Sequence, residues 1–310
     1  MIPNSRRLNR VGLWVVLAII VAELAGRMIG LGDPPLILLD PHVEYYLVPN
    51  QSGRRFGQVY RTNRLGMRSD DASLDRLQGE RSVALFGDSI VFGSGLDQDE
   101  TIGFQLQVEI RKAMSDEAWI VNAVAASSWG PENILAFYRR IQPMRGALAV
   151  VIQSTHDIVD IAHDPSVPPP DRISKPYGAL HDALMSVGRA VSFLRSRAVS
   201  RETYEGKVMR TTRALDVLLT ELKADYRRVV LVFHPDAIEV MTSATGGDYH
   251  FREVASRNGV GFVSNLNLYH HAYSTGLRPH SDDIHLSVDG AKLVSRELMK
   301  IVENLMTYAE

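Results

Sequence analysis

The sequence predicts an α/β fold: a three-layer sandwich in which helices cover both faces of a mainly parallel five-stranded sheet, preceded by one N-terminal transmembrane helix. From residue 82 onward, short apolar runs typical of buried strands alternate with longer stretches of helical periodicity. Strands separated by helices favour parallel pairing with both faces of the sheet covered. Near the N-terminus, residues 11–22 form an apolar run without a single charge, which is typical of a membrane span.

Composition sets the limits of this prediction. The 310 residues are 45% hydrophobic and 23% charged, which suits one large α/β domain with appendages. The formal net charge is −2 and no polybasic tract follows the N-terminus, so we expect no nucleic-acid partner. The chain has no cysteine, which excludes disulfides and thiolate metal sites.

The N-terminal segment divides into a cytoplasmic part, 1–10, and a transmembrane anchor, 11–31. At a helical rise of ~1.5 Å per residue the anchor just crosses a bilayer core of ~30 Å. Arginines before the span predict a cytoplasmic N-terminus with the rest of the chain exported. A cleaved signal peptide is the alternative, but Glu23 stands two residues before Ala25, where a small residue is needed.

The elements follow in order. Residues 32–80 form a proline-containing linker and a β-hairpin segment, and residues 81–310 form the α/β domain. Strands are predicted at 83–86, 119–124, 148–152, 229–233 and 260–263, and helices at 101–114, 131–141 and 291–308. Residues 155–225 exceed the minimal unit. This helical insertion contains a proline-rich break at 165–170 and helices at about 177–197 and 207–226.

Two motifs at opposite ends of this pattern carry chemistry. Gly87-Asp88-Ser89 ends the first strand, so a serine hydroxyl lies at the carboxyl edge of the sheet, where open α/β folds build their sites. Serine needs a base within hydrogen-bond reach to act as a nucleophile. Asp282-x-x-His285, just before the last helix, supplies a histidine and a carboxylate.

These two motifs together resemble the SGNH (GDSL-type) hydrolase superfamily, whose domain is flavodoxin-like. The pattern Arg61-Thr-Asn-x-x-Gly-x-Arg68 resembles a segment of its membrane-anchored bacterial branch, which is associated with exopolysaccharide modification. The resemblance implies that Ser89 is the nucleophile, His285 its base and Asp282 the residue that orients the base. It also implies a single-pass protein of the bacterial inner membrane whose C-terminal domain is periplasmic or otherwise extracytoplasmic.

The family stabilises the reaction's oxyanion with three donors, and this chain departs from that pattern twice. The Ser89 backbone N–H is retained, and His156 stands where the family has an asparagine. Counted from Asn122, the glycine position falls on Ser127, and a shift of one residue would place it on Ala126 or Ser128. A backbone N–H needs no particular side chain, and an imidazole can donate one N–H. Further residues are expected around the pocket: Asp88, Trp129, Asp157 and His234.

The segment 156–164 is rich in histidine and aspartate, which raises the question of a metal. Its spacing matches no known metal motif, and acyl transfer through serine needs no metal. We therefore expect neither a metal nor a cofactor.

The resemblance implies a serine-dependent O-acyl, above all O-acetyl, ester hydrolase or O-acyltransferase. Its substrate would be an acylated exported or cell-surface glycan or a small ester, and polysaccharide biosynthesis proteins are its expected partners beside the membrane. Hydrolase and transferase share every residue named above. A non-catalytic glycan-binding or scaffold protein is the alternative. A lipid-ester hydrolase is a third hypothesis, which predicts an exposed apolar rim from helix 177–197 beside the anchor.

Overall fold

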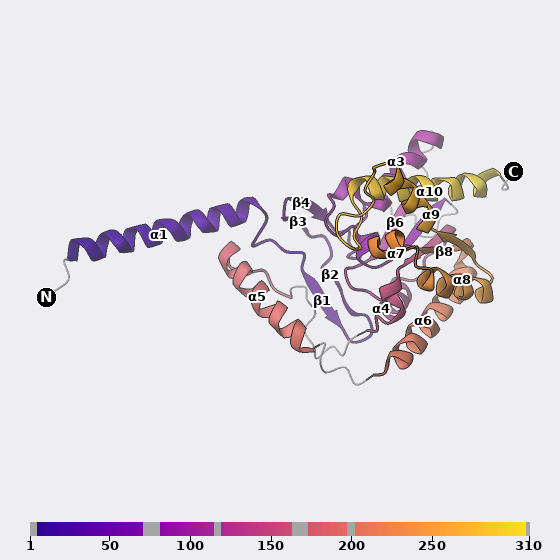
Figure 1. The fold of residues 1–310 in the computed structure, drawn as a ribbon, viewed down its shortest axis with the longest axis horizontal. Coiled ribbons are helices and arrows are strands. Elements are labelled where there is room, and N and C mark those ends of the chain that lie inside the picture. The colour runs from indigo at the N-terminus through magenta and orange to yellow at the C-terminus, as the bar shows by residue number, and fades with distance from the viewer. Residues whose placement is uncertain (1–4, 71–80, 115–118, 163–172, 197–201, 308–310) are drawn as a thin grey trace.

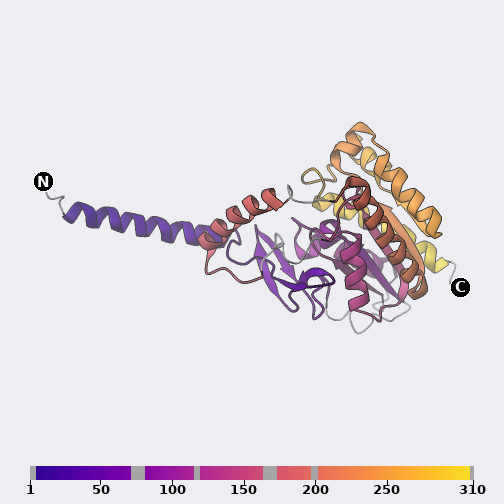
Figure 2. The same ribbon diagram turned by 90° about the horizontal axis from the view of Figure 1, so that it is seen from below.

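The computed structural model describes residues 5–70, 81–114, 119–162, 173–196 and 202–307 (Figure 1). A long N-terminal helix, α1 (Ser5–Met28), projects from a folded body that contains all the strands (Figures 1 and 2). The proline-rich break at 165–170 and the predicted domain boundary at 80 lie outside or at the edge of the described residues.

The body is built on a five-stranded sheet in which every pair of neighbouring strands is parallel, which confirms the predicted fold class. The strand order is β6-β5-β7-β8-β9, the 2-1-3-4-5 order of flavodoxin-like folds. Their bounds are β5 (Ser82–Gly87), β6 (Ile120–Ala125), β7 (Gly146–Gln153), β8 (Tyr226–Phe233) and β9 (Gly261–Ser264).

Burial explains why these runs form strands. All residues of β5, β6 and β7 are buried, as expected where helices cover both faces of a parallel sheet. The edge strand β9 is half-buried along its length.

Helices form the two outer layers. On one face, α3 (Ile102–Met114) packs against α10 (Val288–Thr307) (Figure 1). On the other face lie α4 (Pro131–Arg140), α6 (Tyr204–Asp225) and α8 (Gly246–Asn258). The sequence assigns α6 to the insertion, but Leu215, Leu218 and Leu222 are buried in the core. This helix is therefore the crossover between β7 and β8. The start of the insertion is also part of the body, since Asp157 and Ile158 are buried, and among its described helices α5 (Ala179–Ser196) lies apart from the three layers (Figure 1).

Four described α-helices are absent from the sequence-based prediction: α2 (Ser89–Phe92), α7 (Ala237–Thr242), α8 and α9 (Leu266–Ser274). Short α7 has Asp236 as its N-cap. The Asp236 side chain accepts the N–H of Glu239, which forms a capping box that the sequence signals locally.

The segment before the sheet forms two antiparallel hairpins, where the sequence predicts one. They are β1 (Ile37–Asp40) with β2 (Glu44–Leu47), and β3 (Ser52–Arg55) with β4 (Gln58–Arg61). The second closes through Phe56 and Gly57, both with positive φ, which is the two-residue turn that matches strand twist.

Residues Arg10–Met28 of α1 form the one helix within the described ranges that is long and apolar enough to cross a membrane. The body contacts the end of α1 through α5 (Ala179–Ser196), the helix that follows β7 in the chain (Figures 1 and 2).

Candidate active site

The turn between β5 and α2 (Ser89–Phe92) places Ser89 at the carboxyl edge of the sheet. β5 lies between β6 and β7, at the point where the strand order reverses and where such folds open a crevice. A Cβ on Gly87 would lie 2.5 Å from Val91 Cγ2, so the turn requires glycine there. Asp88 caps α2 by accepting the Ile90 N–H at 2.8 Å.

Ser89, His285 and Asp282 are joined by hydrogen bonds although 196 residues separate the serine from the histidine. His285 Nε2 lies 3.1 Å from Ser89 Oγ, and His285 Nδ1 lies 2.8 Å from Asp282 Oδ2. A carboxylate oxygen only accepts, so Nδ1 carries the proton and Nε2 is free to accept the serine hydroxyl proton. This is the geometry that a serine nucleophile with an oriented base requires.

Asp282 also shapes its own turn. Its Oδ1 accepts the backbone N–H groups of Ile284 at 2.9 Å and His285 at 2.7 Å. Partial burial works against its ionised form, but the His285 ring and these two N–H groups together hold the pKa of Asp282 below its usual value. The carboxylate is therefore ionised when His285 needs orientation.

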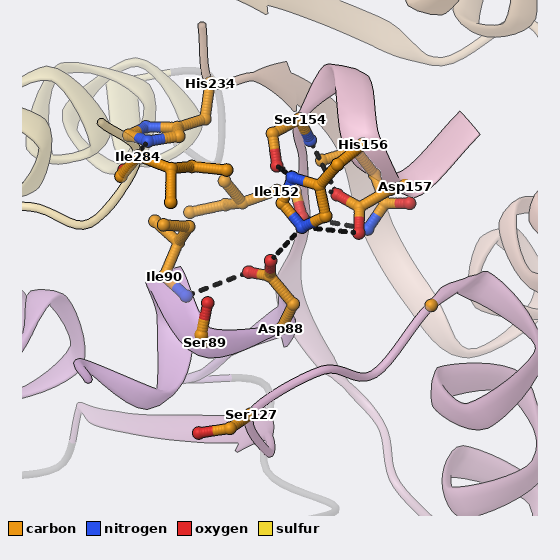
Figure 3. Close-up of polar contacts among 12 residues, drawn as sticks. Asp88, Ser89, Ile90, Ser127, Ile152, Ser154, His156, Asp157, His234 and Ile284 are labelled. Carbon is orange, nitrogen blue, oxygen red and sulfur yellow. Dashed lines mark hydrogen bonds and ion pairs between the residues drawn. The ribbon is translucent and has the colours of Figure 1, made fainter. Parts of the chain in front are cut away.

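Two histidines, His234 and His280, support the loop that carries His285 through hydrogen bonds to backbone carbonyls. His234 is fully buried, and its Nε2–H donates to the Ile284 carbonyl at 2.8 Å (Figure 3). Its Nδ1 accepts from Tyr269 Oη at 2.9 Å. Burial lowers the pKa of His234 to about 4, so the ring is neutral at physiological pH. His280 repeats the arrangement, since its Nε2 lies 3.0 Å from the Pro235 carbonyl and its Nδ1 3.0 Å from Tyr273 Oη.

Arg68 braces the opposite side of the site. Its buried guanidinium uses all five donors: Nη1 donates to the carbonyls of Phe92 and Gly93, Nη2 to those of Val59 and Leu96, and Nε to Gln98 Oε1. The loop after Ser89 is thereby tied to the second hairpin. Of the two arginines that bound the motif, Arg61 is exposed, whereas Arg68 is buried and has a structural role.

His156 does not have the role that the resemblance implies. Its Nε2 lies 3.0 Å from Asp88 Oδ2 and its Nδ1 3.0 Å from Ser154 Oγ (Figure 3). Both ring nitrogens are therefore engaged within the protein, and neither N–H remains for an oxyanion. The expectation that His156 replaces the family's asparagine as a donor is wrong in this geometry.

His156 instead belongs to a charged cluster with Asp88 and Asp157. Burial opposes the charged ring, but Asp157 and Asp88 outweigh it and raise the pKa of His156 to about 10. Burial likewise favours protonated Asp88, yet His156 holds the pKa of Asp88 below its usual value. Burial raises the pKa of Asp157 to about 8, because it disfavours the charged carboxylate. The nearby charge of Asp88 acts in the same direction, and His156 opposes both. The cluster fixes Asp88, and with it the cap of the helix that carries Ser89.

Ser127 lies on the side of Ser89 away from His156 (Figure 3). Its Oγ is 3.1 Å from Ser94 Oγ, which joins the loop after β6 to the loop after α2. The Ser127 N–H makes no hydrogen bond to another described residue. The Ser89 N–H lies in the first turn of α2, where backbone N–H groups have no intrahelical partner. Both are thus available as donors.

The residues expected around the pocket are buried instead. Asp88, Asp157, His234 and Trp129 are each at most 1% exposed. Trp129 packs against Phe137 and donates its Nε1–H to the Tyr45 carbonyl at 3.0 Å, so it anchors the first hairpin to the sheet domain. The sequence marks these positions as near the site but does not show that they face inward.

Within the described ranges, one group of side chains could jointly hold a metal ion. It consists of Asp88, His156 and Asp157, whose ligand atoms lie within 4.8 Å of one another. Asp157 Oδ1 has no hydrogen-bond partner and lies 3.4 Å from His156 Nε2. The ion pair between His156 and Asp88 already uses two of the three ligand atoms.

No known family model matches the chain, and no curated protein matches it in sequence. Similar solved structures include a member of the lipolytic protein G-D-S-L family from Veillonella parvula DSM 2008, at 12% identity over 71% of this chain and 97% of that one, with a TM-score of 0.43. An acetylxylan esterase from Geobacillus stearothermophilus is 16% identical over 72% of this chain and 94% of that one, with a TM-score of 0.45. The protein TesA is 14% identical over 72% and 99%, with a TM-score of 0.46. Similarities at these TM-scores carry no argument about activity, so the reaction of this chain is inferred from its own residues.

Proposed function

We propose that the protein is a serine-dependent O-acyl ester hydrolase or O-acyltransferase that works through an acyl-serine intermediate. One observation carries the proposal: Ser89, His285 and Asp282 form an unbroken hydrogen-bonded chain at the carboxyl edge of the sheet. Ser89 Oγ attacks the ester carbonyl, and His285 Nε2 takes the proton and returns it to the leaving alcohol. In the second half, His285 Nε2 takes a proton from water or an acceptor hydroxyl, whose oxygen attacks the acyl-serine carbonyl. The bond to Ser89 Oγ then breaks, and Oγ receives the proton from His285.

The backbone N–H groups of Ser89 and Ser127 stabilise the tetrahedral oxyanion in this proposal. The third donor of the resembling family is absent, because His156 is engaged with Asp88 and Ser154. Removal of one such donor costs a factor of about 10²–10³ in rate, so we expect slow turnover.

We further propose that the substrate is an O-acetylated glycan outside the cytoplasm and that α1 anchors the protein in the inner membrane, with polysaccharide biosynthesis proteins as partners. The observations that support this are the apolar length of α1 and the resemblance of the motifs.

The test uses the full-length protein in detergent. It is incubated with 4-nitrophenyl acetate, and release of nitrophenol and the intact mass are followed for the wild type, Ser89→Ala and Ser256→Ala, an exposed serine on α8. We expect turnover or an acetyl adduct in the wild type and in Ser256→Ala, and neither in Ser89→Ala. If folded wild type yields neither product, the chain is a glycan-binding or scaffold protein instead.

A lipid-ester hydrolase is a second candidate, favoured by one observation. Leu184 and Val187 of α5 are 72% and 65% exposed beside the end of α1, which is the apolar rim that this hypothesis requires. Nitrophenyl esters of increasing acyl length separate the candidates: a glycan deacetylase prefers acetate, and a lipid-ester hydrolase prefers octanoate or longer chains.

A further inference from the structure

The end of α1 and the start of α5 form one packed junction, although about 150 residues separate them in the chain. Glu23 lies in the last turns of α1, and its carboxylate accepts the N–H groups of Ala179 and Leu180, each at 2.9 Å. It therefore caps the N-terminus of α5, where a negative charge is favourable. Arg27 donates to Glu23 at 2.7 Å and neutralises it.

Close packing and a buried acid make this junction rigid. A Cβ on Gly26 would lie 2.7 Å from the Ala179 Cβ, so the two helices touch where α1 carries no side chain. The buried carboxylate of Asp182, one turn into α5, accepts the Gly32 N–H at 2.7 Å and pairs with Arg55 of the second hairpin. The start of α5 is thus tied to α1, to the chain that leaves it, and to the folded body.

Position along α1 gives the depth of this junction. The span Arg10–Met28 has 19 residues, which at ~1.5 Å each is close to the ~30 Å of a bilayer core. Glu23 lies five residues before Met28, or about 8 Å inside that end. The first turn of α5 therefore lies at the level of the membrane–water boundary if α1 crosses the bilayer.

The outward side of α5 is apolar at this level. Tyr177, Leu180, Leu184 and Val187 are exposed by 93%, 41%, 72% and 65%, and the last three follow helical spacing of four and three residues. Leu180, Leu184 and Val187 are called the apolar face of α5, and Tyr177 lies two residues before the helix begins. Exposed apolar side chains also surround α1 itself, so the face continues the apolar surface of the span. Tyrosine at its start is typical of a membrane interface.

We infer that the first half of α5 is an interfacial helix, whose apolar face lies in the headgroup boundary of the bilayer that α1 crosses. Helices of this type bury one apolar side about 5–10 Å into the boundary and keep the other side on water or protein. Here the other side is the one that carries Asp182, which binds Gly32 and Arg55, while Glu23 caps the N-terminus of the helix. Since α5 is fixed to both α1 and the hairpins, this contact sets the orientation of the folded body relative to the membrane (Figures 1 and 2).

The absence of native cysteine allows a direct test in the full-length protein. Single-cysteine variants are labelled with an environment-sensitive fluorophore and reconstituted into vesicles of phosphatidylcholine and phosphatidylglycerol, with or without spin-labelled lipid as quencher. Leu184→Cys reports on the apolar face, and Leu17→Cys reports on the span. Tyr249→Cys serves as the matched control, because Tyr249 is 69% exposed and lies on α8 of the folded body. Unchanged thermal unfolding of each variant verifies its fold.

We expect lipid quenching at Leu184 to be at least half of that at Leu17 and several-fold greater than at Tyr249. Quenching at Leu184 no greater than at Tyr249 overturns the inference. A label at Leu184 that is shielded from a water-soluble quencher but not quenched by lipid overturns it as well, because another protein or a second copy then covers the face. Lack of lipid quenching at Leu17 removes the bilayer crossing on which the inference depends.

Discussion

The proton on the His285 ring is placed by Asp282, and this leaves Nε2 to accept the hydroxyl proton of Ser89 in the proposed reaction. One carboxylate oxygen faces Nδ1, and the other holds the backbone N–H groups of Ile284 and His285. The two oxygens thus have separable tasks, orientation of the ring and support of the turn.

We predict that Asp282→Asn lowers kcat by a factor of about 10²–10⁴ with little change in stability. The asparagine oxygen can keep both turn hydrogen bonds, but its amide donates to Nδ1 and leaves the proton on Nε2, the wrong tautomer. Kinetics and thermal unfolding are compared with those of Asp283→Asn, a neighbouring acid outside the triad. Equal activity of both variants would show that Asp282 does not orient the base.

Arg68 contributes to stability through the hydrogen bonds that its buried guanidinium donates to oxygen atoms of the surrounding loops. Four carbonyls and one side-chain oxygen depend on its five donors in a buried position. A lysine has at most three donors and cannot reproduce the planar fork.

We predict that Arg68→Lys lowers the free energy of unfolding by about 2–4 kcal/mol, since it leaves at least two buried acceptors without partners. Because those acceptors include the carbonyls of Phe92 and Gly93, kcat falls as well. Urea unfolding and ester hydrolysis are measured beside Arg61→Lys, the exposed arginine of the same motif, for which we expect no effect. Comparable values for the two variants would refute the bracing role.

At the scale of elements, the site is a meeting of three loops at the sheet edge. α2 is capped by Asp88, the loop after β7 holds Asp88 through His156, and the loop before α10 is supported by His234. No single element contains enough contacts to place the triad, so each loop depends on its neighbours.

We predict that His234→Ala lowers stability by about 2–5 kcal/mol, because it removes the side-chain donor to the Ile284 carbonyl and one hydrogen bond of the Tyr269 hydroxyl, and opens a cavity. His234→Gln, which can still donate to the carbonyl, should recover part of the loss. Hydrogen exchange of residues 280–286 should rise in the alanine variant, and kcat should fall more than KM changes. Unaltered exchange there would count against a positioning role.

At the scale of the molecule, the Asp88–His156–Asp157 cluster couples stability to pH. The pKa values of His156 and Asp157 are raised to about 10 and about 8, so the folded state binds more protons than the unfolded chain. The unfolded chain releases these protons at a lower pH than the folded state does. The free energy of unfolding therefore falls as pH rises. For His156 the contribution is complete below its unfolded pKa of about 6.5 and disappears by about pH 10.

We predict that wild-type stability declines between about pH 6.5 and 10, and that Asp157→Asn makes this decline shallower by removing the excess carboxylate. Thermal unfolding is followed across this range, with the exposed Asp99→Asn as control. A wild-type profile that is flat or rises over this window would show that the cluster does not carry the linked protons.

The sequence alone was sufficient for the fold class and for the residues that meet at the triad. The strands of an all-parallel sheet are short apolar runs, and Gly-Asp-Ser and Asp-x-x-His lie at strand and helix ends, so local pattern identifies both. The position of Ser89 follows from topology, because it lies at the carboxyl end of β5, whereas Asp282 and His285 lie in the loop between α9 and α10 and were assigned by the resemblance of their motif.

What only the tertiary structure decided is the environment of each polar side chain. Sequence places His156, His234 and Arg68 near the site but does not show that His156 pairs with Asp88, that His234 supports the loop, or that Arg68 is buried. The pairing of Glu23 with α5, and the core position of α6, depend in the same way on contacts between distant segments. Periodicity and local motifs report on neighbours in the chain, whereas burial, protonation and hydrogen-bond partners are set by neighbours in space.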